Sequence, residues 1–192
     1  MKKTLVTALL YTLITGVILG IGYPLAVTGM GHIFFPREAS GELLTRNGQV
    51  IGSHLIGQAF TGQTYFHSRP SAAGAGYDAT SSSGSNLGPS SKALIQRMQA
   101  SVLAEQTKSG RTNDAGVPVD LVTASGSGLD PDISPAAAYY QVKRVAVERH
   151  LSEAALNDLI EKNTTERQFG LLGEPRVNVL DLNLALDALA AH

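Results

Sequence analysis

The chain begins with a long apolar stretch that contrasts with the mixed pattern after it. No Lys, Arg, Asp or Glu occurs between Lys3 and Arg37. About 20 consecutive apolar residues suffice to span a bilayer as a helix, and residues 5–27 supply that length. A cleaved signal peptide is the alternative, but its apolar segment is shorter, about 7–15 residues, and ends at a small-residue cleavage site. We therefore expect a retained membrane anchor and its flank over residues 1–35, followed by one soluble domain over residues 36–192.

The charges on either side of this stretch predict its orientation. Lys2, Lys3 and the α-amino group precede it, whereas Arg37 on the far side is offset by Glu38. Positively charged flanks stay in the cytoplasm. The N-terminus is therefore expected to be cytoplasmic and the soluble domain extracytoplasmic, in a protein that crosses the cell inner (cytoplasmic) membrane once.

One face of the anchor carries small or helix-bending residues at every fourth position: Thr12, Gly16, Gly20 and Pro24. Gly16 and Gly20 form a GxxxG motif, which lets a neighbouring helix approach closely within a bilayer. The alternative is that glycine is simply commoner in membrane helices than in soluble ones. We interpret this face as a surface for helix packing in the membrane.

After the anchor, apolar residues recur mainly at helical spacing. Asn47-Gly48 between two arms that bear apolar residues is a strong hairpin signal, and Ser134-Pro135 is a typical helix start. The expected helices cover residues 92–108, 135–150, 153–163 and 180–190, the expected extended pieces cover residues 43–51, 118–123 and 176–179, and residues 109–116 are expected to form an exposed turn. The fold class is α+β: a single N-terminal transmembrane helix, then one soluble domain with a small sheet and about three to four helices.

Residues 52–91 are rich in glycine and serine, but they also contain Phe60, Tyr65, Phe66 and Tyr77. Disordered segments are poor in aromatic residues. We therefore expect an irregular segment that is nevertheless ordered.

The stretch VTASGSGLDPDISP, residues 122–135, is dense in hydroxyl groups, glycines and aspartates. The nucleophile elbow of a hydrolase needs glycine two positions before and two after its serine. Neither Ser125 nor Ser127 has these neighbours. We expect a turn that leaves a strand and caps the following helix through Ser134 or Asp130.

The overall composition narrows the class of function. The chain has 192 residues, a net charge of −1 and no cysteine. A near-neutral chain is not suited to binding nucleic acid, and the lack of cysteine excludes disulfides and thiol catalysis. The histidines have no metal-ligand spacing, and Asp130-Pro131-Asp132 lacks the glycine and distal glutamate of a calcium loop. No metal site is expected.

Candidate chemistry beyond this is sparse. The sequence has no SxxK dyad and no Walker A motif. The run SSSGSNLGPSS, residues 81–91, resembles the glycine- and serine-rich turns that can bind an anion through backbone amides, and the alternative is a loop that caps the next helix. Arg69 and Arg144 are expected to be structural or interface residues, and Asp130 is expected to cap backbone amides or to pair with an arginine.

Several stretches together resemble the C subunit of Kdp-type potassium-transporting P-type ATPases. They are GSHLIGQAF, YFHSRPSA, SGSNLGPS, TASGSGLDPDISPAAA, QVKRVA and LLGEPRVNVLDLNLALD, in the family's order and behind the same single anchor. The resemblance extends over nearly the whole chain. This sequence departs from the family pattern at Ser83, where glycine is usual, at Asp132, where histidine is frequent, and at Ser91, where asparagine is frequent.

The resemblance implies a non-catalytic accessory subunit of an ATP-driven potassium importer. Its partners would be a channel-like potassium-binding subunit, a P-type ATPase subunit and a small subunit, within the lipid bilayer. The family is also described as a catalytic chaperone that raises the ATP affinity of the pump subunit. The candidate residues for this nucleotide or interface role are Gln58, Ser82, Gly84, Ser85, Asn86 and Gly88. No covalently bound cofactor is expected, and ATP would be met only through the pump subunit.

The charge pattern and the chaperone role conflict. The flanks of the anchor place residues 36–192 outside, whereas ATP is inside. We therefore expect a cap and stabiliser on the outer face of the complex, with any effect on ATP affinity transmitted through the anchor. The alternative is a membrane-anchored extracytoplasmic hydrolase or binding domain.

Overall fold

The computed structural model describes residues 1–110 and 116–189. Contacts divide the chain into two compact units, unit 1 (Met1–Ile51) and unit 2 (Gly52–His192). The division into an anchor and a soluble domain after residue 35 stays a prediction.

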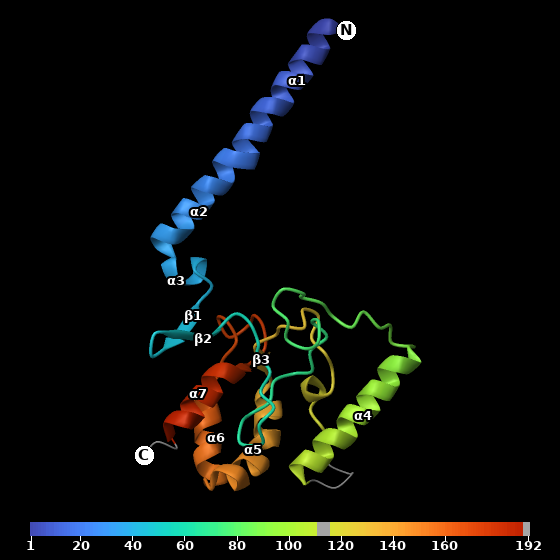
Figure 1. Cartoon of the computed structure of the whole chain (residues 1–192), viewed down its shortest axis with the longest axis vertical. Helices are drawn as coiled ribbons and strands as arrows, with labels where there is room; N and C mark the ends of the chain where they lie inside the picture. The colour runs from blue at the N-terminus through green and yellow to red at the C-terminus, as the bar shows by residue number, and fades with distance from the viewer. Residues whose placement is uncertain (111–115, 190–192) are drawn as a thin grey trace. The chain divides into compact units, whose positions relative to one another are not determined.

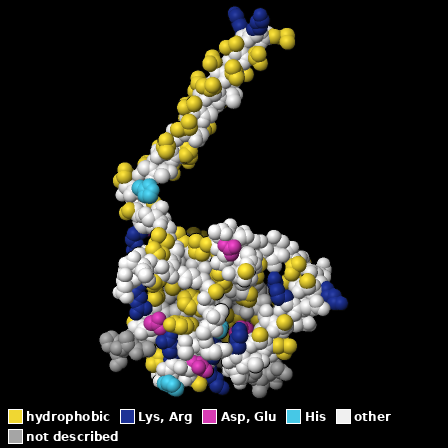
Figure 2. All heavy atoms as spheres, viewed as in Figure 1, with side chains coloured by type: hydrophobic (Ala, Val, Ile, Leu, Met, Phe, Trp, Pro, Cys, Tyr) yellow, Lys and Arg dark blue, Asp and Glu magenta, His cyan; other side chains and the backbone are white. Residues whose placement is uncertain are grey.

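Unit 1 is dominated by one apolar helix, Lys2–Phe34 (Figure 1). It consists of α1 (Lys2–Val17), a π-helical turn (Ile18–Gly22) and α2 (Tyr23–Phe34). Its mean hydropathy reaches 2.1 over the most apolar window, none of which is buried within the chain. Figure 2 shows apolar side chains along its length and basic side chains at its N-terminal end. The helix is long and apolar enough to cross a membrane once, in agreement with the sequence pattern.

The π-helical turn has a local cause. Pro24 has no N–H group, and its ring crowds the carbonyl one turn earlier. The helix responds by widening, so that the N–H of Tyr23 bonds to the carbonyl of Ile18, five residues before it.

The rest of unit 1 is a short helix and most of a hairpin, whose second strand ends just after the boundary with unit 2. α3 (Pro36–Ala39) is followed by β1 (Leu43–Arg46) and β2 (Gln49–Ser53), which form a two-stranded sheet. Asn47 and Gly48 join the strands with φ values of 53° and 76°. Positive φ at both positions is the type I′ turn geometry that suits a twisted hairpin, so the predicted hairpin is confirmed.

Unit 2 is built on three packed helices and a small sheet (Figure 1). The helices are α5 (Pro135–Arg149), α6 (Glu153–Lys162) and α7 (Val179–Leu189). The sheet is antiparallel, in the order β3 (Asp132–Ile133), β5 (Arg176–Asn178), β4 (Thr164–Thr165). A fourth helix, α4 (Lys92–Ser109), packs on α5. This is the α+β class that the sequence predicted.

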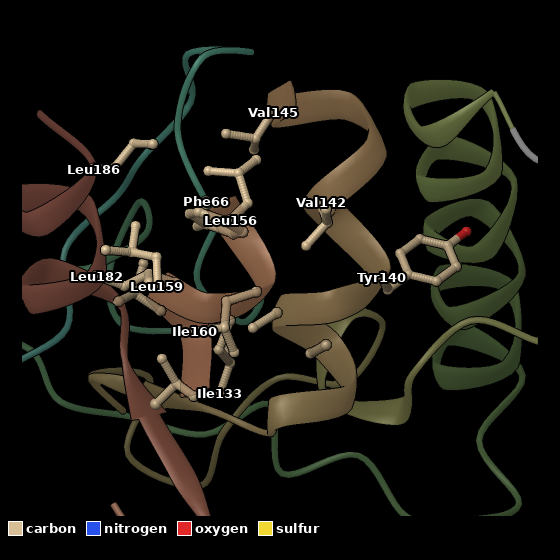
Figure 3. Packing of buried hydrophobic residues seen from close by; sticks show 14 of the residues in the cluster. Phe66, Ile133, Tyr140, Val142, Val145, Leu156, Leu159, Ile160, Leu182 and Leu186 are labelled. Carbon is tan, nitrogen blue, oxygen red and sulfur yellow. The ribbon is translucent and has the colours of Figure 1, made fainter. Parts of the chain in front are cut away.

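The core of unit 2 lies where these helices meet (Figure 3). Leu156 and Ile160 of α6 and Leu182 of α7 are fully buried there, together with Phe66 from the irregular segment. Burying an apolar side chain of this size contributes about 1.5–3 kcal/mol. The burial of Phe66 thus helps to explain why the glycine- and serine-rich segment is ordered.

The helices of unit 2 begin where the sequence predicted. The Ser134 hydroxyl accepts a hydrogen bond from the N–H of Ala137 (3.1 Å) at the start of α5. The Ser152 hydroxyl accepts one from the N–H of Ala155 (3.2 Å) at the start of α6. Each bond satisfies one of the amides left free in a first helical turn. Of the two caps considered for α5, Ser134 is therefore the one used.

The extended piece expected at residues 118–123 is wrong. Its centre is a single 3₁₀ turn, Val119–Leu121. Adjacent side chains of a strand point to opposite faces, but Leu121 and Val122 are both buried. The buried carboxylate of Asp120 accepts the N–H of Ser134 (2.7 Å), which holds the turn against the start of α5.

The exposed turn expected at residues 109–116 is wrong at its first residue. Ser109 is the last residue of α4 and is 7% exposed. Its hydroxyl lies 3.0 Å from that of Tyr140 on α5. Gly110 caps the end of the helix in the left-handed conformation. Residues 111–115 lie outside the described part of the chain.

Candidate functional site

The serine- and glycine-rich stretches singled out in the sequence lie against each other in unit 2. The Ser82 hydroxyl and the Ser83 N–H both donate to the carbonyl of Ser127, each at 2.9 Å. We call the group formed by Arg69, Ser71, Ser82–Gly84 and Ser125–Asp130 the polar loop cluster. The structure thus places part of the predicted nucleotide or interface motif, residues 82–84, against residues 122–135, the stretch considered for a nucleophilic serine.

Glycines allow the two loops of this cluster to touch. A Cβ on Gly84 would lie 2.8 Å from the carbonyl oxygen of Gly126. A Cβ on Gly128 would lie 2.7 Å from the backbone nitrogen of Ala73, and Gly128 also has φ of +69°. Side chains at these positions would collide with backbone that cannot give way. The glycines are therefore required by packing.

Ser125 has a structural bonding pattern. It is 6% exposed, and its hydroxyl accepts the N–H of Gly128 at 2.8 Å. Its other neighbour is the Ser127 hydroxyl at 3.5 Å. A serine nucleophile needs a base within hydrogen-bond reach, and no bond of Ser125 found within the described residues involves a histidine or a carboxylate. The geometry is that of a closed turn.

Arg69 and Asp130 form the ion pair of the cluster. The guanidinium donates to the Asp130 carboxylate at 2.8 Å, and the same carboxylate accepts the N–H of Asp132 at 3.1 Å. The Arg69 carbonyl accepts the hydroxyl of Tyr77, and the Ser71 hydroxyl donates to the carbonyl of Gly128 at 2.6 Å. Asp130 therefore both caps a backbone amide and pairs with an arginine, as its sequence context suggested.

The remaining residues of the proposed nucleotide motif lie outside this contact. Ser85 is half-buried, and Asn86 and Gly88 are exposed, with Asn86 at φ 50°. The Gly88 carbonyl accepts the N–H of Ser91 at 2.9 Å in the turn before α4. Gln58 lies at the start of unit 2, where its side chain fills the space beside Gly52. Their role toward a nucleotide stays a prediction.

The three positions that depart from the family pattern are a residue in a loop hydrogen bond, a helix N-cap and a member of an ion pair. Ser83 donates its hydroxyl to the carbonyl of Gly84 at 3.0 Å. Ser91 occupies the N-cap of α4 without a side-chain cap bond. Asp132 pairs with Arg176 at 3.1 Å. Burial raises the pKa of Asp132 above its usual range, and the nearby Arg176 opposes that shift.

Arg144 belongs to a second, buried polar group. It is 7% exposed on α5, and it donates to the carbonyl of Gln63 and to the side-chain oxygen of Gln141 (2.7 Å for the latter). Burial lowers the pKa of its guanidinium, but an arginine remains charged in proteins. Arg144 thus anchors the irregular segment to α5, which is a structural role.

Two buried amides complete this anchoring, and sequence reasoning missed both. The Gln141 side chain accepts the N–H of His67 (2.7 Å) and donates to its carbonyl (3.1 Å). Asn183 of α7 does the same for Phe66, at 2.9 Å in each direction. We call Gln141 and Asn183 the amide clamp. It satisfies backbone groups that no neighbouring strand reaches.

The signal for the clamp was present in the helical pattern. Gln141 follows Ala137 at a spacing of four, and Asn183 follows Val179 at the same spacing, so both fall on buried helix faces. A polar residue on such a face must find a partner. What the sequence lacks is any sign that the partner is the backbone of residues 66 and 67.

The anchor face is open within the chain. A Cβ on Gly16 or Gly20 would meet nothing within 4 Å, and Thr12 and Pro24 are exposed. In an α-helix a four-residue repeat drifts by about 40° per step, and the wider π turn offsets part of that drift. Thr12, Gly16, Gly20 and Pro24 therefore lie closer to a single face than they would in a regular α-helix. Their role in helix packing stays a prediction.

Within residues 1–110 and 116–189, no group of three or more His, Cys, Asp or Glu side chains could hold a metal ion. Arg69 and Asp130 of the polar loop cluster pair with each other, and its hydroxyls form hydrogen bonds within and between its loops. The fold and this site together define a protein with one helix that is long and apolar enough to cross a membrane, and a small α+β domain whose polar loops bond to one another.

Comparison with known proteins gives the family. The family described as "KdpC: K+-transporting ATPase, c chain" matches residues 5–188. The chain therefore belongs to the KdpC family of potassium-transporting ATPase subunits, as the sequence motifs indicated.

Individual relatives agree along almost their full length. A potassium-transporting ATPase KdpC subunit of Acidobacterium capsulatum is 64% identical over 183 residues, which is 95% of this chain and 97% of the relative. The subunit of Koribacter versatilis is 53% identical, over 97% of this chain and 95% of its own. That of Mycobacterium tuberculosis is 53% identical, over 98% of this chain and all of its own.

Proposed function

We propose that this protein is a non-catalytic accessory subunit of an ATP-driven potassium importer. Its role is to assemble and stabilise the channel-like and ATP-hydrolysing subunits, with the small subunit as a further partner. The observation that carries the proposal is the family match over residues 5–188. The names of the relatives point to the transport complex, and the architecture, an apolar helix followed by a small domain, supports an accessory role in it.

The structure supports the accessory role through what its polar residues do. Serines, glycines and the Arg69–Asp130 pair of the polar loop cluster hold loops together, and Arg144 and the amide clamp hold the irregular segment. A rigid domain of this kind presents a fixed surface to its partners. A membrane-anchored hydrolase is the alternative, and it would show as substrate turnover by the purified chain.

The charge flanks support an outer position for unit 2. Lys2 and Lys3 precede the anchor helix, and Arg37 beyond it is offset by Glu38. The domain then lies on the side of the membrane opposite ATP. We propose that any influence on ATP affinity passes through the anchor helix, whose face of Thr12, Gly16, Gly20 and Pro24 would pack on a partner helix.

The ATP question has a direct test in the whole complex. Replacing Ser85 and Asn86 together by alanine should leave the apparent KM for ATP unchanged, because these side chains would not meet the nucleotide. ATPase activity of the purified complex at varied ATP measures this. Asn157→Ala, at an exposed position of α6 outside the candidate residues, serves as the control. A large rise in KM with the complex intact would support direct nucleotide contact instead.

Assembly is tested by affinity purification. The tagged full chain should bring the other subunits of the transporter with it from membranes. Purification of the chain alone, with its partners expressed, would contradict the proposed function.

A further inference from the structure

The loop between β4 and β5 exposes large apolar side chains. Phe169 is 92% exposed and Leu171 is 80% exposed, the two highest values for large apolar residues in the described part of unit 2. Leu172 beside them is 59% exposed. We call residues 168–172 the apolar knob. Neighbouring apolar side chains held in water mark interaction sites more often than single ones do.

The backbone of the knob is fixed by hydrogen bonds. The N–H of Gln168 donates to the carbonyl of Leu172, and the N–H of Leu172 donates to the carbonyl of Gln168, both at 2.9 Å. Phe169 has φ of 54° and Gly170 has φ of 72°. A left-handed conformation costs a non-glycine residue about 1–2 kcal/mol. Residues held in this way collect at functional sites.

This fixed shape favours a shaped partner. A loop that is already in its bound conformation loses little conformational entropy on binding. That advantage matters for insertion into a pocket of defined form, and it matters less for insertion into fluid lipid. An exposed aromatic ring at the tip is also the kind of side chain that dominates binding energy when it fills such a pocket.

The charges around the knob also favour a protein partner over a membrane surface. Arg167 and Glu174 on its two sides form an ion pair with each other, and Glu166 precedes them. Segments that lie on a membrane surface combine apolar residues with an excess of Lys and Arg. The knob has no such excess, since one of its flanking residues is basic and two are acidic. Its surroundings suit a protein surface better than an anionic bilayer.

We propose that the apolar knob docks into an apolar pocket on another subunit of the same potassium-transporting ATPase, with Phe169 as its central anchor. The proposal rests on the proposed function, because it requires those subunits. Leu171 and Leu172 then exclude water around the ring, as residues around a binding hot spot do. The Arg167–Glu174 pair remains at the polar rim.

The direct test is site-specific crosslinking in the assembled complex. Phe169→p-benzoylphenylalanine in the full chain should give, on irradiation of membranes, a covalent adduct with one other subunit. Val147→p-benzoylphenylalanine on α5 is the matched control, because Val147 is 65% exposed and lies outside the knob; it should give no such adduct. An adduct with lipid alone, no adduct, or equal adducts at both positions would overturn the proposal.

A second variant tests the strength of the contact. Phe169→Ala should reduce retention of the other subunits during detergent washing by at least about tenfold, as expected for a hot-spot residue, whereas Val147→Ala should not. The melting temperature of the chain should stay unchanged, because the ring is exposed. If the wild-type chain retains its partners and Phe169→Ala retains them equally, the knob proposal alone is wrong. If the wild-type chain brings no partner, the proposed function itself is wrong.

Discussion

Asn183 and Gln141 act as substitutes for a neighbouring strand. Each offers a carbonyl oxygen and an amide nitrogen to one residue of the irregular segment, at Phe66 and His67. A side-chain amide can accept and donate at once, as a peptide group of a strand does. Both are 2% exposed, so water cannot replace them.

This predicts a large effect of Asn183→Ala. The change leaves the N–H and the carbonyl of Phe66 buried without partners, at a cost of about 1–3 kcal/mol for each unsatisfied group. Denaturant unfolding of the full chain should show a loss of about 2–6 kcal/mol. Asn157→Ala, at an exposed position of α6, is the control and should change stability by less than about 0.5 kcal/mol. Equal effects of the two variants would contradict the clamp.

His67 should make stability depend on pH. Burial, and then the charge of Arg144, lower its pKa from the ordinary histidine value of 6.5, and its ring nitrogen lies 3.0 Å from the carbonyl of Gly62. Of the other charged groups that act on it from α4, Lys108 also lowers the pKa and Glu105 opposes this. Because the unfolded chain binds the proton more readily, stability is complete above pH 6.5 and falls as the pH drops through the lowered native pKa.

The measurement is the melting temperature of the full chain between pH 7.5 and pH 5, for wild type and His67→Gln. The variant should lose less stability on acidification. His150→Asn is the control, because His150 is exposed and asparagine tolerates its left-handed backbone. Asp132 works in the opposite direction, since its raised pKa favours the folded state as the pH falls toward 3.8. It is common to all variants and cancels in the comparison.

At the scale of elements, the polar loop cluster depends on close backbone contact. Gly128→Ala should lower stability by at least about 2 kcal/mol, because it combines a left-handed residue with a backbone collision. Gly126→Ala is the matched control two residues earlier, where a Cβ meets nothing within 4 Å. Thermal melts of the two variants give the comparison. If Gly126→Ala is as damaging as Gly128→Ala, the packing account of the cluster is wrong.

The sequence predicted an element correctly where residues close together in the chain determine it. The starts of α5 and α6 at Ser134 and Ser152, and the hairpin at Asn47-Gly48, are fixed by neighbours in the chain, so they were predictable. The strand expected at residues 118–123 is wrong. The Asp120 carboxylate accepts the N–H of Ser134, which lies 14 positions later in the chain, and this contact holds the segment in a 3₁₀ turn. Local alternation of apolar residues carries no information on such a contact.

The same distinction between local and distant contacts applies to the candidate site. The pairing of Asp130 with an arginine was expected, although its assignment to Arg69, 61 positions earlier, needed the structure. The clamp by Gln141 and Asn183 joins elements that are far apart in sequence, so no local pattern could specify its backbone partners. The exposure of Phe169 is also invisible in the sequence, because apolar residues in a short run usually belong to a core.

At the scale of the whole molecule, the chain combines a helix that is long and apolar enough to cross a membrane with a domain whose loops are held by buried polar bonds. Membership of the KdpC family gives the transporter to which such a chain contributes. We propose that unit 2 lies on the extracytoplasmic side of the membrane, away from ATP, and acts by holding other subunits. Both parts of this proposal depend on the orientation of the chain in the membrane.

The lack of cysteine makes orientation measurable. Asn157→Cys, exposed on α6, would be treated in intact cells with a membrane-impermeant maleimide; Ser109→Cys, at a position that is 7% exposed, is the buried control and should react only after denaturation. We expect Asn157→Cys to be labelled in intact cells. Labelling only after the membrane is opened would place unit 2 in the cytoplasm beside ATP and contradict the proposed outer position.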